Sequence, residues 1–329
     1  MVRIAINGFG RIGRSLTRAL QQYHTIEIIA INDLANTKTL AHLLKYDSIH
    51  GRFNGEITST ENAISINGKT IQVLNEKDPK DLPWSALNID IVIESTGLFL
   101  TKELASQHLT AGAKKVILSA PPKSEAIKTV VLGINDGNID GTEEIISNAS
   151  CTTNAAAPLI KVLHDLYHIE SAYITTVHSY TSDQTLHDAP HRDLRRARAG
   201  AQSIIPTTTG AAKAITKIFP DLEGNIGGCG IRVPVPNGSL IDISVILKED
   251  TTVEAINKAF KDSSETYLKG ILEYTEDPIV SIDIVGNPHS CIFDAELTSI
   301  TGQMVKLVGW YDNEMGYSNR LAELVLKIS

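Results

Sequence analysis

One cysteine, Cys151, lies where the sequence pattern changes from strand to helix, in the stretch SNASCTTN (147–154). If the helix begins at Cys151 with Ser150 as its N-cap, the thiol lies at the positive end of the helix dipole. That position favours the thiolate and is expected to lower the pKa of the thiol. A thiolate here could attack an aldehyde carbon, although this stretch alone also fits a packing residue or a metal ligand.

A nucleophilic thiol needs a nearby base, and the strand-like run ITTVHS offers His178 as the candidate. His187 and His191 follow closely, so spacing alone leaves the choice of base open. A histidine in a strand is also often a plain core residue. The chain has no CxxC pair and no histidine at zinc-finger spacing, which argues against structural disulfides and against a metal site for its three cysteines, Cys151, Cys229 and Cys291.

Several segments suit the binding of anions. HRDLRRAR (191–198) is locally basic within an acidic protein, and PTTTGAAK (206–213) places hydroxyl groups and a glycine ahead of a helix. Arg232 lies in the apolar run IRVPVP, where burying it without an anion would be costly. Each feature alone fits a solvated surface or a helix cap, but together they predict a site for a phosphorylated substrate.

The segment GFGRIG near the N-terminus predicts a dinucleotide site. It follows a strand-like run and opens a helical pattern, so Gly8 permits the tight turn, Gly10 the approach of a pyrophosphate and Gly13 close packing of helix on strand. Asp33 ends the next strand-like run, where a carboxylate accepts hydrogen bonds from ribose hydroxyls and repels a 2′-phosphate. NAD is therefore favoured over NADP, although Arg11 and Arg14 leave NADP open.

The elements that must position these residues alternate in the first half of the chain. Strand-like runs enclose helical patterns, and the short crossovers between them predict a parallel sheet, with Asn67-Gly68 marking an inserted hairpin within 64–74. The predicted strands are 3–7, 26–33, 89–96, 114–120, 129–135 and 144–150, and the predicted helices are 11–23, 39–47 and 102–111.

Beyond Cys151 strands follow one another with few helices, which favours a mostly antiparallel sheet. A terminal helix over 315–328 is expected to pack back on the first domain. We therefore expect an α/β fold, with a Rossmann-type parallel-sheet NAD domain over 1–150 joined by 315–329 and an α+β catalytic domain over 151–314. The predicted elements here are helix 152–167 and strands 172–181, 230–236, 239–248, 280–285 and 304–312.

Composition narrows the class of protein. A chain of 329 residues suits two domains, and 42% hydrophobic with 21% charged residues is typical of a globular protein. A net charge of −8 argues against a dedicated nucleic-acid site. The sequence has no signal-peptide pattern and no run of apolar residues long enough to span a membrane, so we expect a cytoplasmic protein with no membrane partner.

Seven motifs together resemble the phosphorylating glyceraldehyde-3-phosphate dehydrogenase family: INGFGRIGR, SNASCTTN, TTVHSYTSDQ, LRRAR, IIPTTTGAAKA, RVPVPNGS and WYDNEMGYSNR. The resemblance covers the whole chain and implies the NAD-dependent conversion of D-glyceraldehyde 3-phosphate and inorganic phosphate to 1,3-bisphosphoglycerate, a step of glycolysis and gluconeogenesis. It implies that Cys151 forms a thiohemiacetal and then a thioester, with His178 as the base. It also implies a homotetramer, with the segment near 179–202 at the subunit interface.

The resemblance also implies roles for other residues. Thr181 and Arg232 match those that hold the phosphate of the substrate, and Arg195 matches a residue between the two phosphate sites. Residues matching the site of the attacking phosphate are Ser150, Thr152, Thr209 and Gly210. Residues matching NAD contacts are Gly8, Gly10, Arg11, Ile12, Gly13, Asp33, Ser119, Asn313 and Tyr317.

Two alternatives stay open. Erythrose-4-phosphate dehydrogenase is a related enzyme with the same cysteine and histidine, but TTTGAAKA favours a true phosphate acceptor. An NAD-binding protein with a secondary role as an adhesin or in RNA binding is the other alternative, and the intact Cys151 and His178 argue that catalysis is retained. Ala189 stands where NAD-preferring relatives often carry leucine, whereas Pro190 agrees with them, so the preference for NAD is an expectation.

Overall fold

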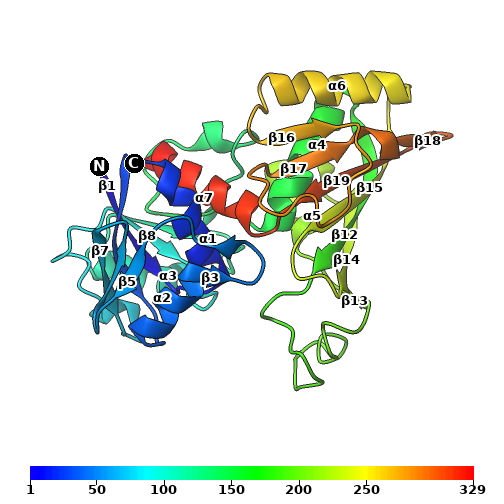
Figure 1. Ribbon diagram of the computed structural model, residues 1–329. Coiled ribbons are helices and arrows are strands. Elements are labelled where there is room, and N and C mark those ends of the chain that lie inside the picture. The colour runs from blue at the N-terminus through cyan, green and yellow to red at the C-terminus, as the bar shows by residue number, and fades with distance from the viewer. The chain divides into compact units, whose positions relative to one another are not determined.

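The computed structural model describes residues 1–329 and divides the chain into two compact units (Figure 1). The first unit comprises residues 1–130, 137–149 and 318–329, so it holds both termini of the chain. The second comprises residues 131–136 and 150–317.

The first unit is built on a nine-stranded sheet in the order β10-β11-β9-β8-β1-β2-β7-β6-β5. All pairs from β10 to β7 are parallel, and β7-β6 and β6-β5 are antiparallel. The predicted parallel sheet is confirmed. Its strands are β1 (Val2–Asn7), β2 (Ile26–Asn32), β5 (Ile57–Ser59), β6 (Ala63–Ile66), β7 (Lys69–Leu74), β8 (Ile91–Glu94), β9 (Lys115–Leu118), β10 (Lys128–Thr129) and β11 (Ile145–Ser147).

Local sequence rules explain the elements around this sheet. The apolar strands β1 and β8 are buried on both faces, as expected of a central parallel strand covered by helices. Asn67 and Gly68 take φ of 50° and 81°, as a two-residue hairpin turn requires, so the predicted hairpin is confirmed. The remaining elements are α1 (Arg11–Ala19), η1 (Leu20–Gln22), α2 (Thr37–Lys45), the ribbon of β3 (Tyr46–Asp47) and β4 (Gly51–Arg52), η2 (Pro79–Asp81), α3 (Lys102–Thr110) and η3 (Asp136–Asn138).

The second unit is built on an eight-stranded sheet in the order β13-β14-β12-β15-β19-β17-β16, with β18 also paired to β19. Only β12-β14 and β16-β17 are parallel, so the prediction of a mostly antiparallel sheet is confirmed. Its strands are β12 (Ile169–Ser179), β13 (Ile205–Thr207), β14 (Ile226–Val233), β15 (Ser239–Leu247), β16 (Leu272–Thr275), β17 (Cys291–Asp294), β18 (Ser299–Thr301) and β19 (Met304–Tyr311).

Helices pack on this sheet, and between β12 and β13 a long segment extends away from it (Figure 1). The long helix α4 begins at Cys151, where the sequence predicted it, and its residues Ala155–Ala157 are fully buried among the strands. The expected C-terminal helix is confirmed as α7 (Met315–Ile328), and its residues from Ser318 onward belong to the first unit. The other helices are α5 (Ala211–Ile218), η4 (Pro220–Leu222), α6 (Val253–Glu265) and η5 (Ala295–Leu297).

Two predicted strands are wrong for most of their length. Only Thr129 of 129–135 is in a strand, because the Asn135 side chain accepts a hydrogen bond from the Val131 amide at 2.7 Å and closes a turn. In 280–285 the Asp283 carboxylate accepts from the Val280 amide at 2.8 Å and likewise closes a turn. The alternating apolar residues there do not face a core, since Ile282 is 71% exposed.

Candidate active site

The glycines of GFGRIG occupy three different environments at the end of β1. Gly8 has φ of +94°, and a Cβ atom there would lie 2.8 Å from the backbone of Ser95 and Thr96. A Cβ on Gly13 would lie 2.4 Å from the Gly8 carbonyl oxygen, whereas a Cβ on Gly10 would meet no atom within 4 Å. Gly8 and Gly13 therefore serve the turn and the helix packing, and Gly10 leaves space open beside the helix N-terminus.

That open space belongs to a cavity of about 540 Å³ in the first unit. Asp33, which follows β2, lies in its wall, and its carboxylate accepts hydrogen bonds from the amides of Phe9 at 2.8 Å and Ala35 at 2.9 Å. These bonds fix the carboxylate and leave further lone pairs to accept from hydroxyl groups. The cavity is lined by Asn7, Gly8, Gly10, Asn32, Asp33, Leu34, Glu76, Lys77, Ser95, Thr96, Leu98 and Phe99, a set that fits the apolar base and the ribose of an adenosine.

The two arginines that left NADP open have partners within the first unit. Arg11 donates to the Asp47 carboxylate at 2.8 Å, and Arg14 donates to the Phe9 carbonyl oxygen at 2.8 Å. Ile12 lies in the first turn of α1, and Ser119 follows β9, where its amide donates to the Glu94 carbonyl oxygen at 2.9 Å. With Arg11 and Arg14 engaged and Asp33 in the wall, the charges fit a ribose with free hydroxyls better than a 2′-phosphate.

Asn313 and Tyr317 belong to the second unit. The Asn313 side-chain oxygen accepts hydrogen bonds from the hydroxyls of Ser179 and Ser239, each at 2.9 Å. The two N–H groups of the Asn313 side chain therefore remain available to donate to a ligand. Tyr317 lies in the first turn of α7 and is buried.

In the second unit, the cysteine and the predicted base are brought together. The Cys151 Sγ lies 3.5 Å from the Nε2 of His178, which lies near the end of β12. Ser150 caps α4, since its hydroxyl accepts from the Thr153 amide at 3.1 Å. His191 instead faces Asp183 at 3.3 Å, and no contact joins His187 to Cys151, so the geometry selects His178 among the three histidines.

The other side of the His178 ring faces Arg232. These two residues are register partners on the parallel strands β12 and β14. The Nδ1 of His178 lies 2.7 Å from the Ser179 carbonyl oxygen and 2.8 Å from an Arg232 nitrogen, which itself donates to the same oxygen at 2.8 Å. If Nδ1 carries the proton, it donates to the Ser179 carbonyl, and Nε2 is free to accept a hydrogen bond from the thiol. If Nδ1 is unprotonated, it accepts from Arg232, and the proton is on Nε2.

Burial sets the protonation of this pair. It lowers the pKa of His178 from 6.5 to about 3, and the positive charge of Arg232 adds to this effect. Burial also raises the pKa of the Cys151 thiol, although Arg232 opposes that shift. The backbone amides at the start of the helix favour the thiolate and act to lower the pKa of Cys151, but desolvation of the thiolate outweighs them, so the net shift of the pKa is upward. The resting pair is a neutral imidazole beside a thiol.

One residue of the site has no signal in the sequence. The hydroxyl of Tyr311, at the end of β19, lies 3.1 Å from the Thr152 hydroxyl and 2.8 Å from that of Thr176. The Tyr311 ring meets the His178 ring edge to face, with centroids 6.0 Å apart. Tyr311 thus joins the first turn of α4 to β12 and fixes the imidazole, but nothing local distinguishes it from an ordinary strand tyrosine.

The residues predicted to bind phosphate lie in loops and at helix starts of the second unit. Gly210 is the N-cap of α5 without a capping side chain, and the Thr209 hydroxyl accepts from the Ala211 amide at 3.2 Å. Thr181 follows β12, and Arg195 is exposed with its side chain unpaired. The neighbouring Arg196 is instead held by Asp183 at 2.7 Å, so it braces the loop.

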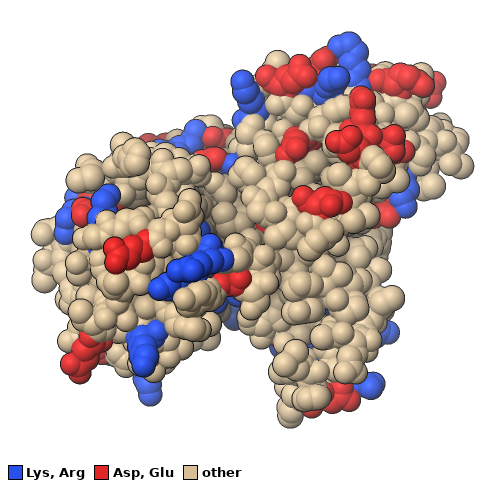
Figure 2. Space-filling view, viewed as in Figure 1, with Lys and Arg blue, Asp and Glu red and all other residues tan.

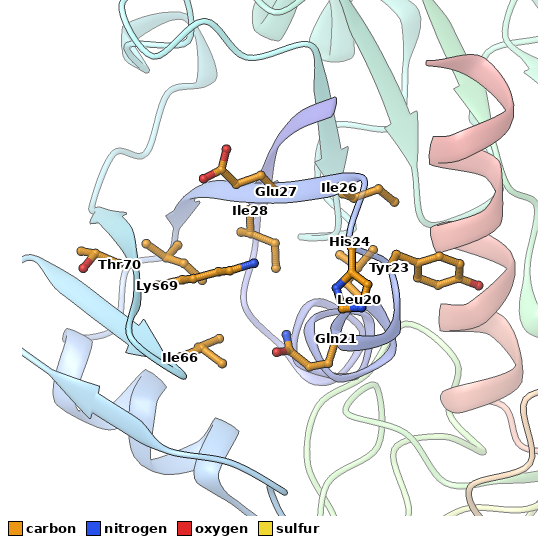
Figure 3. Close-up of a pocket in the computed structure, with 11 residues that line it drawn as sticks. Leu20, Gln21, Tyr23, His24, Ile26, Glu27, Ile28, Ile66, Lys69 and Thr70 are labelled. Atoms are coloured by element: carbon orange, nitrogen blue, oxygen red, sulfur yellow. The ribbon is translucent and has the colours of Figure 1, made fainter. Parts of the chain in front are cut away.

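Other features of the molecule carry no part of these sites. A cavity of about 180 Å³ beside η1, β2 and the β6-β7 hairpin is lined by both apolar and polar side chains and contains no predicted site residue (Figure 3). On the face drawn in Figure 2, basic side chains are scattered and form no continuous band. No three or more His, Cys, Asp and Glu side chains cluster as metal ligands would, and no helix has the length and apolar character needed to cross a bilayer.

Comparison with known proteins finds one family for both parts of the chain. Residues 2–102 match the model of the glyceraldehyde 3-phosphate dehydrogenase NAD binding domain, and residues 150–313 match that of the C-terminal domain. The chain is 54% identical to glyceraldehyde-3-phosphate dehydrogenase 2 of Streptomyces avermitilis, with 99% of this chain and 98% of the relative covered. It is 52% identical to the glyceraldehyde-3-phosphate dehydrogenase of Geobacillus stearothermophilus, with 100% and 98% covered.

Proposed function

Because the chain belongs to the glyceraldehyde-3-phosphate dehydrogenase family, we propose that it oxidises D-glyceraldehyde 3-phosphate with NAD and inorganic phosphate to 1,3-bisphosphoglycerate, in glycolysis or gluconeogenesis. The observation that carries this proposal is the 3.5 Å contact between the Cys151 thiol and the His178 imidazole. A thiol with an adjacent base is the group that covalent catalysis on an aldehyde requires.

In the proposed reaction His178 Nε2 takes the proton of the Cys151 thiol as the sulfur bonds to the aldehyde carbon, and it then returns that proton to the aldehyde oxygen, which becomes a hydroxyl. The product is a thiohemiacetal on Cys151. His178 then accepts the proton of its hydroxyl as the carbon is oxidised to a thioester. Bound NAD supplies the hydride acceptor for that oxidation. Both proton transfers require the tautomer in which the Nδ1 hydrogen is donated to the Ser179 carbonyl and the Nε2 lone pair faces the sulfur.

We propose that Arg232, which already donates to the Ser179 carbonyl, also binds the phosphate of the substrate. Arg232 is mostly buried and forms no ion pair with a carboxylate in the second unit, so an anion beside it would be strongly favoured. We assign Arg232 and Thr181 to the substrate phosphate, and Arg195 to a position between the two phosphate sites. The attacking phosphate, which cleaves the thioester, is assigned to Ser150, Thr152, Thr209 and Gly210, where two helix N-termini offer amide donors.

The NAD contacts are assigned in the same way. The adenosine would lie against Asp33, the pyrophosphate against the start of α1 at Gly8, Gly10, Arg11, Ile12 and Gly13, and the nicotinamide amide against Asn313, with Ser119 and Tyr317 as further contacts. We also propose an NAD-binding domain over 1–150 with 315–329 and a catalytic domain over 151–314. The division of the chain into two units supports these limits except at residues 131–136, 150 and 315–317, which belong to the second unit.

We further propose a homotetramer in the cytoplasm. The segment between β12 and β13 exposes large apolar side chains, with Leu186 at 70%, Leu194 at 82% and Ile204 at 71%, which a subunit interface would cover. All three cysteines are free thiols, as expected in a reducing compartment. Light scattering of the purified protein measures the subunit number directly.

The test is to follow NADH formation by its ultraviolet absorbance with glyceraldehyde 3-phosphate as substrate. Turnover that requires inorganic phosphate, prefers NAD to NADP and is lost in Cys151→Ser would support the proposal. Erythrose 4-phosphate serves as the competing substrate. Faster turnover with it, or indifference to phosphate, would instead favour an erythrose-4-phosphate dehydrogenase that hydrolyses the thioester.

A further inference from the structure

A fully buried carboxylate lies beneath the NAD cavity of the first unit. Glu94 ends β8 and has no exposed surface, and no lysine or arginine pairs with it. Its Oε2 accepts from the Asn7 amide at 2.6 Å and contacts the His108 Nε2 at 3.0 Å. Its Oε1 accepts from both the amide and the hydroxyl of Thr96. A buried charge without a cation is costly unless such bonds satisfy it, so a role for this carboxylate is to be expected.

The direction of the hydrogen bonds at His108 follows from one donor. The indole nitrogen of Trp84 lies 3.0 Å from the His108 Nδ1, and an indole can only donate. The Nδ1 of His108 is therefore unprotonated, so the ring is neutral and carries its hydrogen on Nε2. That hydrogen is donated to Glu94. His108 and Trp84 are both fully buried, so no water competes for these bonds.

From Glu94 the network crosses the end of the sheet in the order of its strands. Asn7 ends β1 and receives at its side-chain oxygen a hydrogen bond from Asn32, the last residue of β2, at 2.7 Å. Asn32 in turn holds the backbone of Glu76, just beyond β7, by bonds of 2.9 Å to its carbonyl and 2.8 Å to its amide. Asn7, Asn32, Glu76 and Thr96 all line the NAD cavity, whereas Glu94 does not.

We propose that Glu94 is a positioning residue for NAD, whose buried carboxylate orients the side chains and backbone groups that form the adenosine half of the cavity. This inference rests on NAD being the ligand of that cavity. Glu94 itself touches no ligand. It sets which atom of Asn7 faces Asn32, and through Asn32 it fixes the loop at Glu76.

Glu94→Gln tests the orientation while it preserves the size of the side chain. If the new amide group replaces Oε1, it faces the Thr96 backbone N–H, which cannot reverse. If it replaces Oε2, Asn7 must turn over, and its amide then faces the amide of Asn32. His108 cannot adapt freely, because its other nitrogen is needed by Trp84. Each choice leaves two donors opposed, so the cavity wall must shift.

Trp84→Phe is the matched control. It removes only the indole N–H at the far end of the same network, keeps an aromatic ring in the core and leaves the bonds of Glu94 to Asn7 and Thr96 in place. Both variants are expected to lower the Tm measured by circular dichroism. Calorimetric titration of the full chain should show Kd values for NAD and for AMP raised about tenfold or more in Glu94→Gln, and unchanged within about twofold in Trp84→Phe.

Steady-state rates separate positioning from loss of folded enzyme. In Glu94→Gln the KM for NAD should rise with kcat nearly unchanged, whereas mere misfolding would lower kcat and leave KM alone. Equal losses of NAD affinity in the two variants, or wild-type affinity in Glu94→Gln, would overturn the inference. If Glu94→Gln does not fold, Glu94→Asp, which keeps the charge but shortens its reach, replaces it with the same expected result. Failure of the wild-type chain to bind NAD would instead refute the assigned cofactor.

Discussion

The three fingerprint glycines allow stability and NAD binding to be separated by single methyl groups. In Gly8→Ala the new Cβ would lie 2.8 Å from the backbone of Ser95 and Thr96, at a φ of +94°. A left-handed conformation costs about 1–2 kcal/mol and overpacking costs about 1–3 kcal/mol more, so we expect a loss of about 2–5 kcal/mol. For a unit of this size the Tm should fall by about 5 °C or more.

Gly10→Ala should behave in the opposite way. Its Cβ would meet no atom within 4 Å, and the φ of −69° suits alanine, so the stability should stay within about 0.5 kcal/mol of the wild type. The methyl group would occupy the space where we place the pyrophosphate. If it displaces one charge-assisted hydrogen bond, worth about 1.5–3 kcal/mol, the Kd for NAD should rise about 10- to 150-fold.

The assay pairs thermal unfolding with calorimetric titration of NAD. Gly137→Ala is the control, because it also adds a methyl group in open space but lies outside the cavity, and both of its values should match the wild type. Wild-type NAD affinity in Gly10→Ala would refute the assignment of the pyrophosphate to this turn. A large drop of Tm in Gly10→Ala would refute the geometry itself.

Four further outcomes are expected in the second unit. Cys151→Ser should abolish NADH formation, and His178→Asn should lower kcat by about 10²- to 10⁴-fold with native circular dichroism, whereas a residual rate near the wild type would contradict the role of His178 as base. Because the pKa of His178 falls from 6.5 to about 3 on folding, the unfolded chain binds the extra proton. The contribution of His178 to the free energy of unfolding is complete above about pH 6.5 and is lost as the pH falls towards 3. The loss is at most roughly 4–5 kcal/mol. Acidification should therefore lower the urea midpoint less in His178→Asn than in the wild type. Arg232→Leu should raise the KM for glyceraldehyde 3-phosphate about tenfold or more and should reduce kcat/KM more for this substrate than for unphosphorylated glyceraldehyde, whereas equal losses on both substrates would argue against a phosphate contact.

The parts of the fold that the sequence predicts correctly depend on neighbouring residues. The Ser150 cap, the Asn67-Gly68 turn and the glycine fingerprint are local patterns whose geometry is set within a few residues. The failures at 131–135 and 280–285 are also local, but there a side chain, Asn135 or Asp283, bonds the backbone of its own segment. Such bonds compete with strand pairing, and a pattern of alternating apolar residues does not reveal them.

The contacts that define the candidate site depend on register between distant strands. Arg232 meets His178 because β12 and β14 are parallel neighbours, a pairing that the antiparallel expectation did not contain. Tyr311 reaches Thr152 across 159 positions of the chain. Glu94 could have been suspected as a charged residue that ends a buried strand, but its partners Asn7 and His108 come from other elements. No local rule joins them.

A comparison of Cys151 with Cys291 shows which neighbours make a buried thiol a nucleophile. Burial raises the pKa of both Cys151 and Cys291, so burial alone makes neither a nucleophile. Cys291 lies within β17, and burial is the one cause of its shift. Cys151 differs because a neutral imidazole lies within reach of its proton and the charge of Arg232 stabilises the thiolate. The same charge disfavours the imidazolium that proton transfer creates. An anion bound to Arg232 would offset its positive charge and so reduce the electrostatic cost of the His178 imidazolium. The guanidinium of Arg232 therefore links binding of a phosphorylated substrate to activation of the base.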